Sequence, residues 1–167
     1  MQLVLDKTSD LIAKSGGVAT DQDHVKIVLE QNGTLKPRNP VIETVMECRR
    51  RKLTDDHPDY LEAKRQKDEI GVGLSIIAKH LADRRVDYII LLCNTVHFFE
   101  AYVRDVLVDY PEVKFLSIID LVADKVQRHV NDCQDFNPIA ILGQRGCMIS
   151  NLYQNALTKR NIKFYTL

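Results

Sequence analysis

The second half of the chain alternates short apolar runs with longer amphipathic stretches, and this alternation limits the possible folds more than any other feature. Three apolar, β-branched runs predict buried strands: residues 87–93, 113–119 and 139–143. Helices are predicted for residues 94–110, which Pro111 ends, and for 120–131, which Asp120 caps. Such strands, alternating with helices, are typical of a parallel sheet covered on both faces. We therefore expect an α/β domain with three layers and a mainly parallel central sheet.

The rest of the chain fits the same pattern. Helices are predicted around residues 4–12, ending at Gly16 and Gly17, and over residues 41–52, 60–84 and 144–160. Residues 25–29 predict a further buried strand, and residues 162–167 a final strand or the connection leading out of the domain. No repeat or linker interrupts the 167 residues, so we expect a single domain over residues 1–167.

Charge and composition exclude several classes of function. The 23 basic and 23 acidic side chains give zero net charge, which removes the broad attraction that nucleic-acid or anionic-membrane binding requires. The longest apolar run, residues 88–93, is too short to span a membrane. The four cysteines form no CxxC pair, and the histidines show no metal-ligand spacing. Because charged residues also occur within the first ten positions, we expect no signal peptide and a cytoplasmic protein with reduced thiols and no metal.

Chemistry is expected where strands lead into helices, because open α/β sheets bind ligands at the carboxyl ends of their strands. Cys93 ends one predicted strand, and Asn94 or Thr95 is suited to cap the next helix. The positive end of a helix dipole favours a thiolate at this position, and His97 could orient the sulfur or help to ionise it. The alternative is an inert cysteine at the end of a core strand. The residues alone leave both interpretations open.

Two other loops carry weaker signals. Gly143 and Gly146 permit a tight turn whose N–H groups could cradle a carboxylate, although such turns often only connect a strand to a helix. Arg38 follows the first predicted strand and offers a planar fork for a carboxylate, although by itself an arginine here favours the interpretation as a solvated surface residue. Gly71 and Gly73 interrupt the long predicted helix, which indicates either close packing or a break.

Taken together, these loops resemble one protein family. Residues 93–97 (CNTVH) resemble the Cys-Asn-Thr-Ala-His motif of the aspartate/glutamate racemase family, in which the first catalytic cysteine follows an apolar strand. Residues 21–24 and 32–38, on either side of a predicted strand, are similar to the aspartate-racemase branch in order and spacing. Residues 143–153 are similar to the family's Gly-Thr turn followed by Ser-x-x-Tyr, with Ser150 and Tyr153 matching. The resemblance extends from about residue 1 to residue 167.

The resemblance implies cofactor-independent racemisation at the α-carbon of an acidic amino acid, aspartate or glutamate, in a flavodoxin-like lobe. One thiolate removes the α-proton while an opposing thiol donates a proton to the other face. Cys93 would be one of these two thiols, supported by His97. The expected substrate contacts are Arg38, Asn94, Thr95, Gly146 and Cys147. The family resemblance also favours a homo-oligomer.

The chain departs from the family in three places. It begins at the helix that follows the family's Gly-rich first strand and turn, and Cys147 stands where the family has threonine. It ends at Leu167, about where a second lobe with the opposing Gly-Cys-Thr-Glu cysteine would start. We therefore expect either a racemase lobe that is inactive alone, or a non-catalytic binding module for acidic amino acids that pairs with another chain. Either form is expected to expose apolar surface at its strand ends and to self-associate.

Overall fold

The computed structural model describes Lys14 and residues 28–30, 33, 35–132 and 138–166. The chain divides into two units, residues 1–30 and 31–167. The helices and strands described below all belong to the second unit. The helix predicted around residues 4–12 lies outside the described residues. Of the strand predicted at residues 25–29, only Val28 and Leu29 are described, and they belong to no helix or strand.

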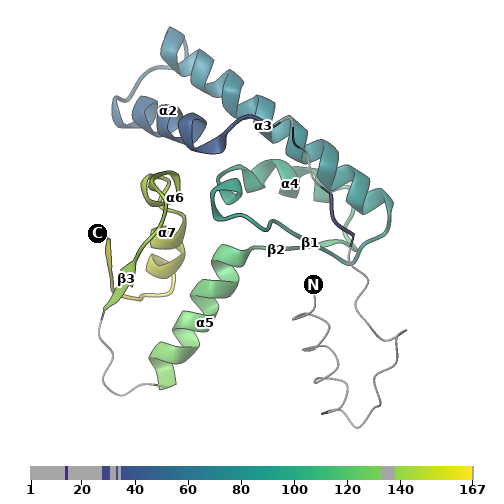
Figure 1. The fold of residues 1–167 in the computed structure, drawn as a ribbon, viewed down its shortest axis with the longest axis vertical. Coiled ribbons are helices and arrows are strands. Elements are labelled where there is room, and N and C mark those ends of the chain that lie inside the picture. Colours follow the sequence, from purple (N-terminus) through teal and green to yellow (C-terminus); the bar gives the residue numbers. More distant parts are fainter. Residues whose placement is uncertain (1–13, 15–27, 31–32, 34, 133–137, 167) are drawn as a thin grey trace. The chain divides into compact units, whose positions relative to one another are not determined.

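Two helices begin the second unit, α2 (Arg38–Arg50) and α3 (Pro58–Asp83), and both were predicted with slightly later starts (Figure 1). Pro58 opens α3, where its missing N–H costs nothing, and the His57 ring nitrogen Nδ1 accepts the N–H of Asp59 at 3.1 Å. Gly71 in α3 marks close packing and not a break. A β-carbon at Gly71 would lie 2.5 Å from ring atoms of Tyr102, which belongs to a later helix that packs on α3.

The first strand–helix units follow. Strand β1 (Tyr88–Ile90) leads to the 3-10 helix η1 (Asn94–Phe99) and on to α4 (Glu100–Leu107), whereas β2 (Lys114–Leu116) leads to α5 (Ile118–Asp132). The two strands pair in parallel and are shorter than predicted. The helix predicted over residues 94–110 therefore begins as 3-10 helix, and α5 starts before the expected cap. The Asp120 N–H is accepted by the hydroxyl of Ser117 at 3.4 Å, so Ser117 provides that cap.

The last elements are β3 (Ile139–Ile141), α6 (Arg145–Ile149), α7 (Leu152–Thr158) and β4 (Phe164–Thr166), and β3 pairs with β4 in parallel. The helix predicted to run to residue 160 is divided, because Asn151 adopts a left-handed conformation with φ of 55°. Such a residue cannot continue an α-helix, and asparagine tolerates this conformation better than most residues. The predicted final strand is confirmed at residues 164–166.

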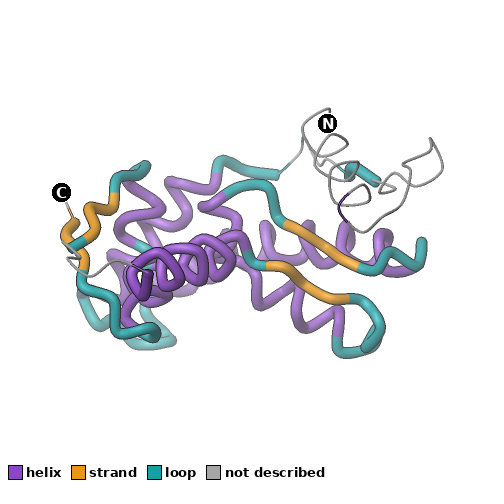
Figure 2. Tube along the Cα trace, turned by 90° about the horizontal axis from the view of Figure 1, so that it is seen from below, coloured by secondary structure: helices purple, strands orange, loops and turns teal. Residues whose placement is uncertain are grey.

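The strands of the described residues form two separate two-stranded parallel sheets, β1–β2 and β3–β4 (Figure 2). The α/β class and the parallel pairing are confirmed at this level. One central sheet in three layers is not seen in the described residues, because the β1–β2 pair is not hydrogen-bonded to the β3–β4 pair. Each pair has only three paired residues per strand.

Two apolar cores hold these elements together. The larger lies among α2, α3, η1 and α4 and contains the fully buried Ile42, Ile70 and Phe99. The smaller lies among α5, α7 and the β3–β4 sheet and is centred on Ala123 and Leu157. Among the helices of the described residues, none combines the length and apolar character needed to cross a membrane.

Candidate functional site

The predicted site residues come from three separate segments that the fold brings together. Helix α6 packs against both α2 and η1, as Figure 1 shows for α2 and α6. Gly146 allows this approach, since a β-carbon there would lie 2.6 Å from Oδ1 of Asn39 in the first turn of α2. The amide of Asn39 also donates to Oε1 of Gln144 at 3.4 Å. The start of α2, the β1–η1 junction and α6 therefore meet around Cys93.

The Cys93 thiol is half-buried between β1 and η1. Burial by itself would raise the pKa of Cys93, but the surrounding groups outweigh it and hold the pKa below its ordinary value. The hydroxyl of Thr95 lies 3.3 Å from the sulfur, the N–H groups of Val96 and Thr95 face it, and the charge of Arg38 adds a smaller effect. This environment favours the reactive thiolate over the inert core cysteine.

Arg38 and Thr95 thus act on the same sulfur from different elements. Arg38 is the first residue of α2, not part of a loop as expected, and it is half-buried. Thr95 is buried in η1, where its hydroxyl can donate to a thiolate. A guanidinium near the sulfur favours the thiolate, and its planar fork is also suited to a carboxylate.

His97 supports Cys93 through the backbone. Its ring is 1% exposed, Nδ1 lies 2.9 Å from the Cys93 carbonyl oxygen, and Nε2 accepts the N–H of Ile118 at 3.2 Å. A carbonyl only accepts and a backbone N–H only donates, so these bonds assign a neutral ring with its proton on Nδ1. Both nitrogens are engaged by backbone groups, which leaves neither available to the sulfur. His97 therefore fixes the β1–η1 junction against the start of α5.

A contact that the strand pattern did not predict joins η1 to α7. The Tyr153 hydroxyl donates to Oδ1 of Asn94 at 3.0 Å. Asn94 is exposed and Tyr153 is half-buried. Burial, and then the charge of Cys147, raise the pKa of Tyr153, so its hydroxyl keeps its proton. The only sequence signal for this contact was the match of Tyr153 to the Ser-x-x-Tyr pattern.

Cys147 lies in α6 within electrostatic reach of Cys93. Its side chain is buried, and burial followed by the charge of Cys93 raises its pKa. The two cysteines are therefore shifted in opposite directions, with Cys93 favouring the thiolate and Cys147 the thiol. Cys48, in contrast, is buried in α2 and donates to the Asp59 carbonyl at 3.6 Å. Cys133 lies outside the described residues.

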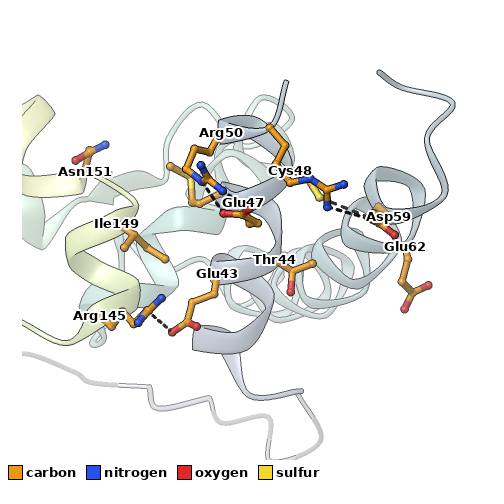
Figure 3. Close-up of a pocket in the computed structure, with 12 residues that line it drawn as sticks. Glu43, Thr44, Glu47, Cys48, Arg50, Asp59, Glu62, Arg145, Ile149 and Asn151 are labelled. Atoms are coloured by element: carbon orange, nitrogen blue, oxygen red, sulfur yellow. Dashed lines mark hydrogen bonds and ion pairs between the residues drawn. The ribbon is translucent and has the colours of Figure 1, made fainter. Parts of the chain in front are cut away.

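A surface hollow lies elsewhere, between α2, the first turns of α3 and α6 (Figure 3). Most of the charged side chains that line it pair with one another. The pairs are Arg50 with Glu47 at 2.6 Å, Arg51 with Asp59 at 3.0 Å, and Arg145 with Glu43 at 3.4 Å. Cys93 does not line this hollow, and exposed ion pairs of this kind add little to stability because solvent screens them. Each of these six charged side chains already has an oppositely charged partner, so the hollow offers a ligand none of these charges unpaired.

No group of three or more His, Cys, Asp or Glu side chains in the described ranges is placed to hold a metal ion. The sequence matches no protein-family model.

Proposed function

We propose that this chain is a cysteine-bearing lobe of an amino-acid racemase of the aspartate/glutamate type, acting at the α-carbon of an acidic amino acid. The supporting observation is the environment of Cys93, where Thr95, two backbone N–H groups and Arg38 lower the pKa of a half-buried thiol at a strand end. We further propose that the complete fold is a flavodoxin-like lobe in three layers. The proposal also includes a homo-oligomeric state.

In the proposed reaction, the Cys93 thiolate takes the α-proton of the bound amino acid and becomes a thiol. The electron pair of the broken C–H bond moves toward the adjacent carboxylate, where Arg38 and the amide of Asn94 stabilise the added negative charge. Inversion is completed when a second thiol donates a proton to the opposite face of the α-carbon. No cofactor is needed, because the carboxylate itself accepts the electron pair.

In the proposed site, Cys147 stands where the family has threonine. Its raised pKa keeps it protonated, which suits a neighbouring hydrogen-bond donor to the substrate. Both Cys93 and Cys147 belong to the same unit, whereas inversion requires thiols on opposite faces of the substrate. This shared origin favours a second candidate function, a non-catalytic binding module that holds acidic amino acids and pairs with another chain.

An exchange experiment tests the proposal. The protein is incubated with D- and L-aspartate and with D- and L-glutamate in heavy water, and loss of the α-proton and chirality are followed by NMR and chiral chromatography. Exchange with inversion, abolished in Cys93→Ala and retained in Cys48→Ala, supports the racemase. Cys48→Ala is the matched control, since it removes a thiol that bonds to the Asp59 carbonyl.

The remaining outcomes separate the alternatives. Exchange of one enantiomer without inversion shows a half-site that holds one working base. Binding without any exchange contradicts the enzyme and supports the binding module. Absence of both binding and exchange contradicts both proposals.

A further inference from the structure

A hydrogen bond from Tyr153 to Asn94 joins α7 to η1 at the site, and it connects residues 59 positions apart in the sequence. Tyr153 lies in the first turn of α7, directly after the left-handed residue Asn151 that divides α6 from α7. Gln154 ties this turn to α6, because its amide donates to the Met148 carbonyl at 2.9 Å. The turn that carries Tyr153 is thus tied to α6.

The direction of this bond determines which end of the Asn94 amide is free. A phenol that keeps its proton donates, so it holds the amide oxygen Oδ1 and leaves the NH₂ group with two donors to offer elsewhere. Without that bond the amide could rotate by 180° and present its oxygen instead. Asn94 follows Cys93 directly in the chain and is exposed, so its NH₂ group is open to a ligand from solvent.

We propose that Tyr153 is a positioning residue that holds the Asn94 amide with its NH₂ group toward the ligand, so that the position beside Cys93 selects a carboxylate over a carboxamide. A carboxylate only accepts hydrogen bonds and matches two donors. A carboxamide presents its own donors at one end and lacks the charge that Arg38 attracts. The identity of the ligand as an acidic amino acid rests on the proposed function, whereas the orientation of Asn94 does not.

The first experiment tests the orientation without any ligand. Nitrogen-15 relaxation of the Asn94 side-chain NH₂ group, assigned by its loss in Asn94→Ala, is measured in wild type, Tyr153→Phe and Tyr110→Phe. Tyr110→Phe is the matched control, since it also removes a phenol hydrogen bond, to Asp83 at 2.5 Å. We expect shifted resonances and a lower order parameter in Tyr153→Phe alone. An Asn94 NH₂ group that is equally ordered in Tyr153→Phe overturns the positioning role.

The second experiment tests the selection. Dissociation constants are measured for L-aspartate and for its two monoamides, L-asparagine and L-isoasparagine, so that each carboxylate is replaced in turn. Wild type and Tyr110→Phe are expected to bind aspartate at least tenfold more tightly than one of the amides. Tyr153→Phe is expected to lose most of that preference. A preference that is unchanged in Tyr153→Phe overturns the proposal.

A double-mutant cycle shows whether Tyr153 acts through Asn94 or through folding. In the Asn94→Ala background, Tyr153→Phe is expected to change aspartate affinity by less than twofold, since the amide it positions is gone. An equal effect in both backgrounds contradicts the positioning role. If wild type binds none of the three ligands, the proposed function and the carboxylate selection both fail, while the relaxation data still decide whether Tyr153 orients Asn94.

Discussion

The Cys93 thiol experiences two opposing influences, and their balance determines its chemistry. Partial burial disfavours the thiolate, while the Thr95 hydroxyl, two N–H groups and Arg38 favour it and prevail. Burial of Cys147 and the neighbouring negative charge of Cys93 both raise the pKa of Cys147. Two cysteines in one site are therefore expected to react very differently.

We predict that iodoacetamide alkylates Cys93 faster than Cys147 and Cys48 at every pH from 6 to 9. The thiolate is the nucleophile, and a lowered pKa gives Cys93 more thiolate at a given pH. Cys147 and Cys48 are both buried, which adds a steric barrier. Peptide mass spectrometry after timed alkylation measures the three rates. Equal rates for Cys93 and Cys147 would contradict the assigned environments.

Replacing Thr95 by valine tests the cause of that reactivity. The Thr95→Val side chain keeps its shape but cannot donate to the sulfur, so the pKa of Cys93 should rise and its alkylation profile should move to higher pH. Thr44→Val is the matched control, because the Thr44 hydroxyl bonds to the Pro40 carbonyl at 2.9 Å. A profile that stays in place in Thr95→Val would show that the hydroxyl does not stabilise the thiolate.

At the scale of elements, His97 joins β1 and η1 to α5. We predict that His97→Ala lowers the free energy of unfolding by about 2–5 kcal/mol, because it leaves a cavity and unpairs the Cys93 carbonyl and the Ile118 N–H. Urea denaturation measures the loss. His80→Ala, at an exposed position of α3, is the control and should change stability by less than about 0.5 kcal/mol. A similar small change in His97→Ala would contradict the bridging role.

The contact between α3 and α4 depends on Gly71. In Gly71→Ala the new methyl group would lie 2.5 Å from the Tyr102 ring, which a hydrogen bond from the Tyr102 hydroxyl to Asp68 holds in place. We predict that overpacking lowers the free energy of unfolding by about 1–3 kcal/mol, despite the better helix propensity of alanine. Gly33→Ala has no atom within 4 Å of the added carbon and should be tolerated. Thermal melts compare the two, and an unchanged Gly71→Ala would show that the helices can move apart.

The division between α6 and α7 shows where sequence patterns reach their limit at this scale. The apolar periodicity of residues 144–160 fits one continuous helix, yet the left-handed conformation of Asn151 separates α6 from α7. The strands predicted at residues 87–93, 113–119 and 139–143 are found at those places but are shorter than predicted, because an apolar run continues past the point where the partner strand can pair. Val28 and Leu29, from the strand predicted at residues 25–29, belong to no strand. Leu92 belongs to the run that predicted a strand, lies outside β1, and is 78% exposed.

At the scale of the whole molecule, exposed leucines follow two of the strands. Leu92 after β1 is 78% exposed and Leu142 after β3 is 75% exposed. Large apolar side chains at such exposure favour association, and we predict that the protein forms dimers of two copies of this chain. Sedimentation velocity over a range of concentrations measures this.

Charge substitutions localise the predicted contact. Leu92→Lys and Leu142→Lys should shift the sedimentation boundary toward monomer. Val108→Lys is the control, since Val108 is 77% exposed at the end of α4 and away from both strand ends in the chain. A wild type that sediments only as a monomer would contradict the prediction.

The α/β class, the parallel pairing and most helix positions could be predicted from the amino-acid sequence, because apolar periodicity and turn residues act locally. The sequence also marked Cys93, Asn94, Thr95 and Arg38 as candidates for one site. The folded chain was needed to find that Arg38 and Thr95 lower the pKa of Cys93, and that the nitrogens of His97 bond to backbone groups and not to the sulfur. Packing likewise brought Tyr153 to Asn94. Hydrogen bonds and charge effects depend on distances between segments, and no local pattern in the chain records those distances.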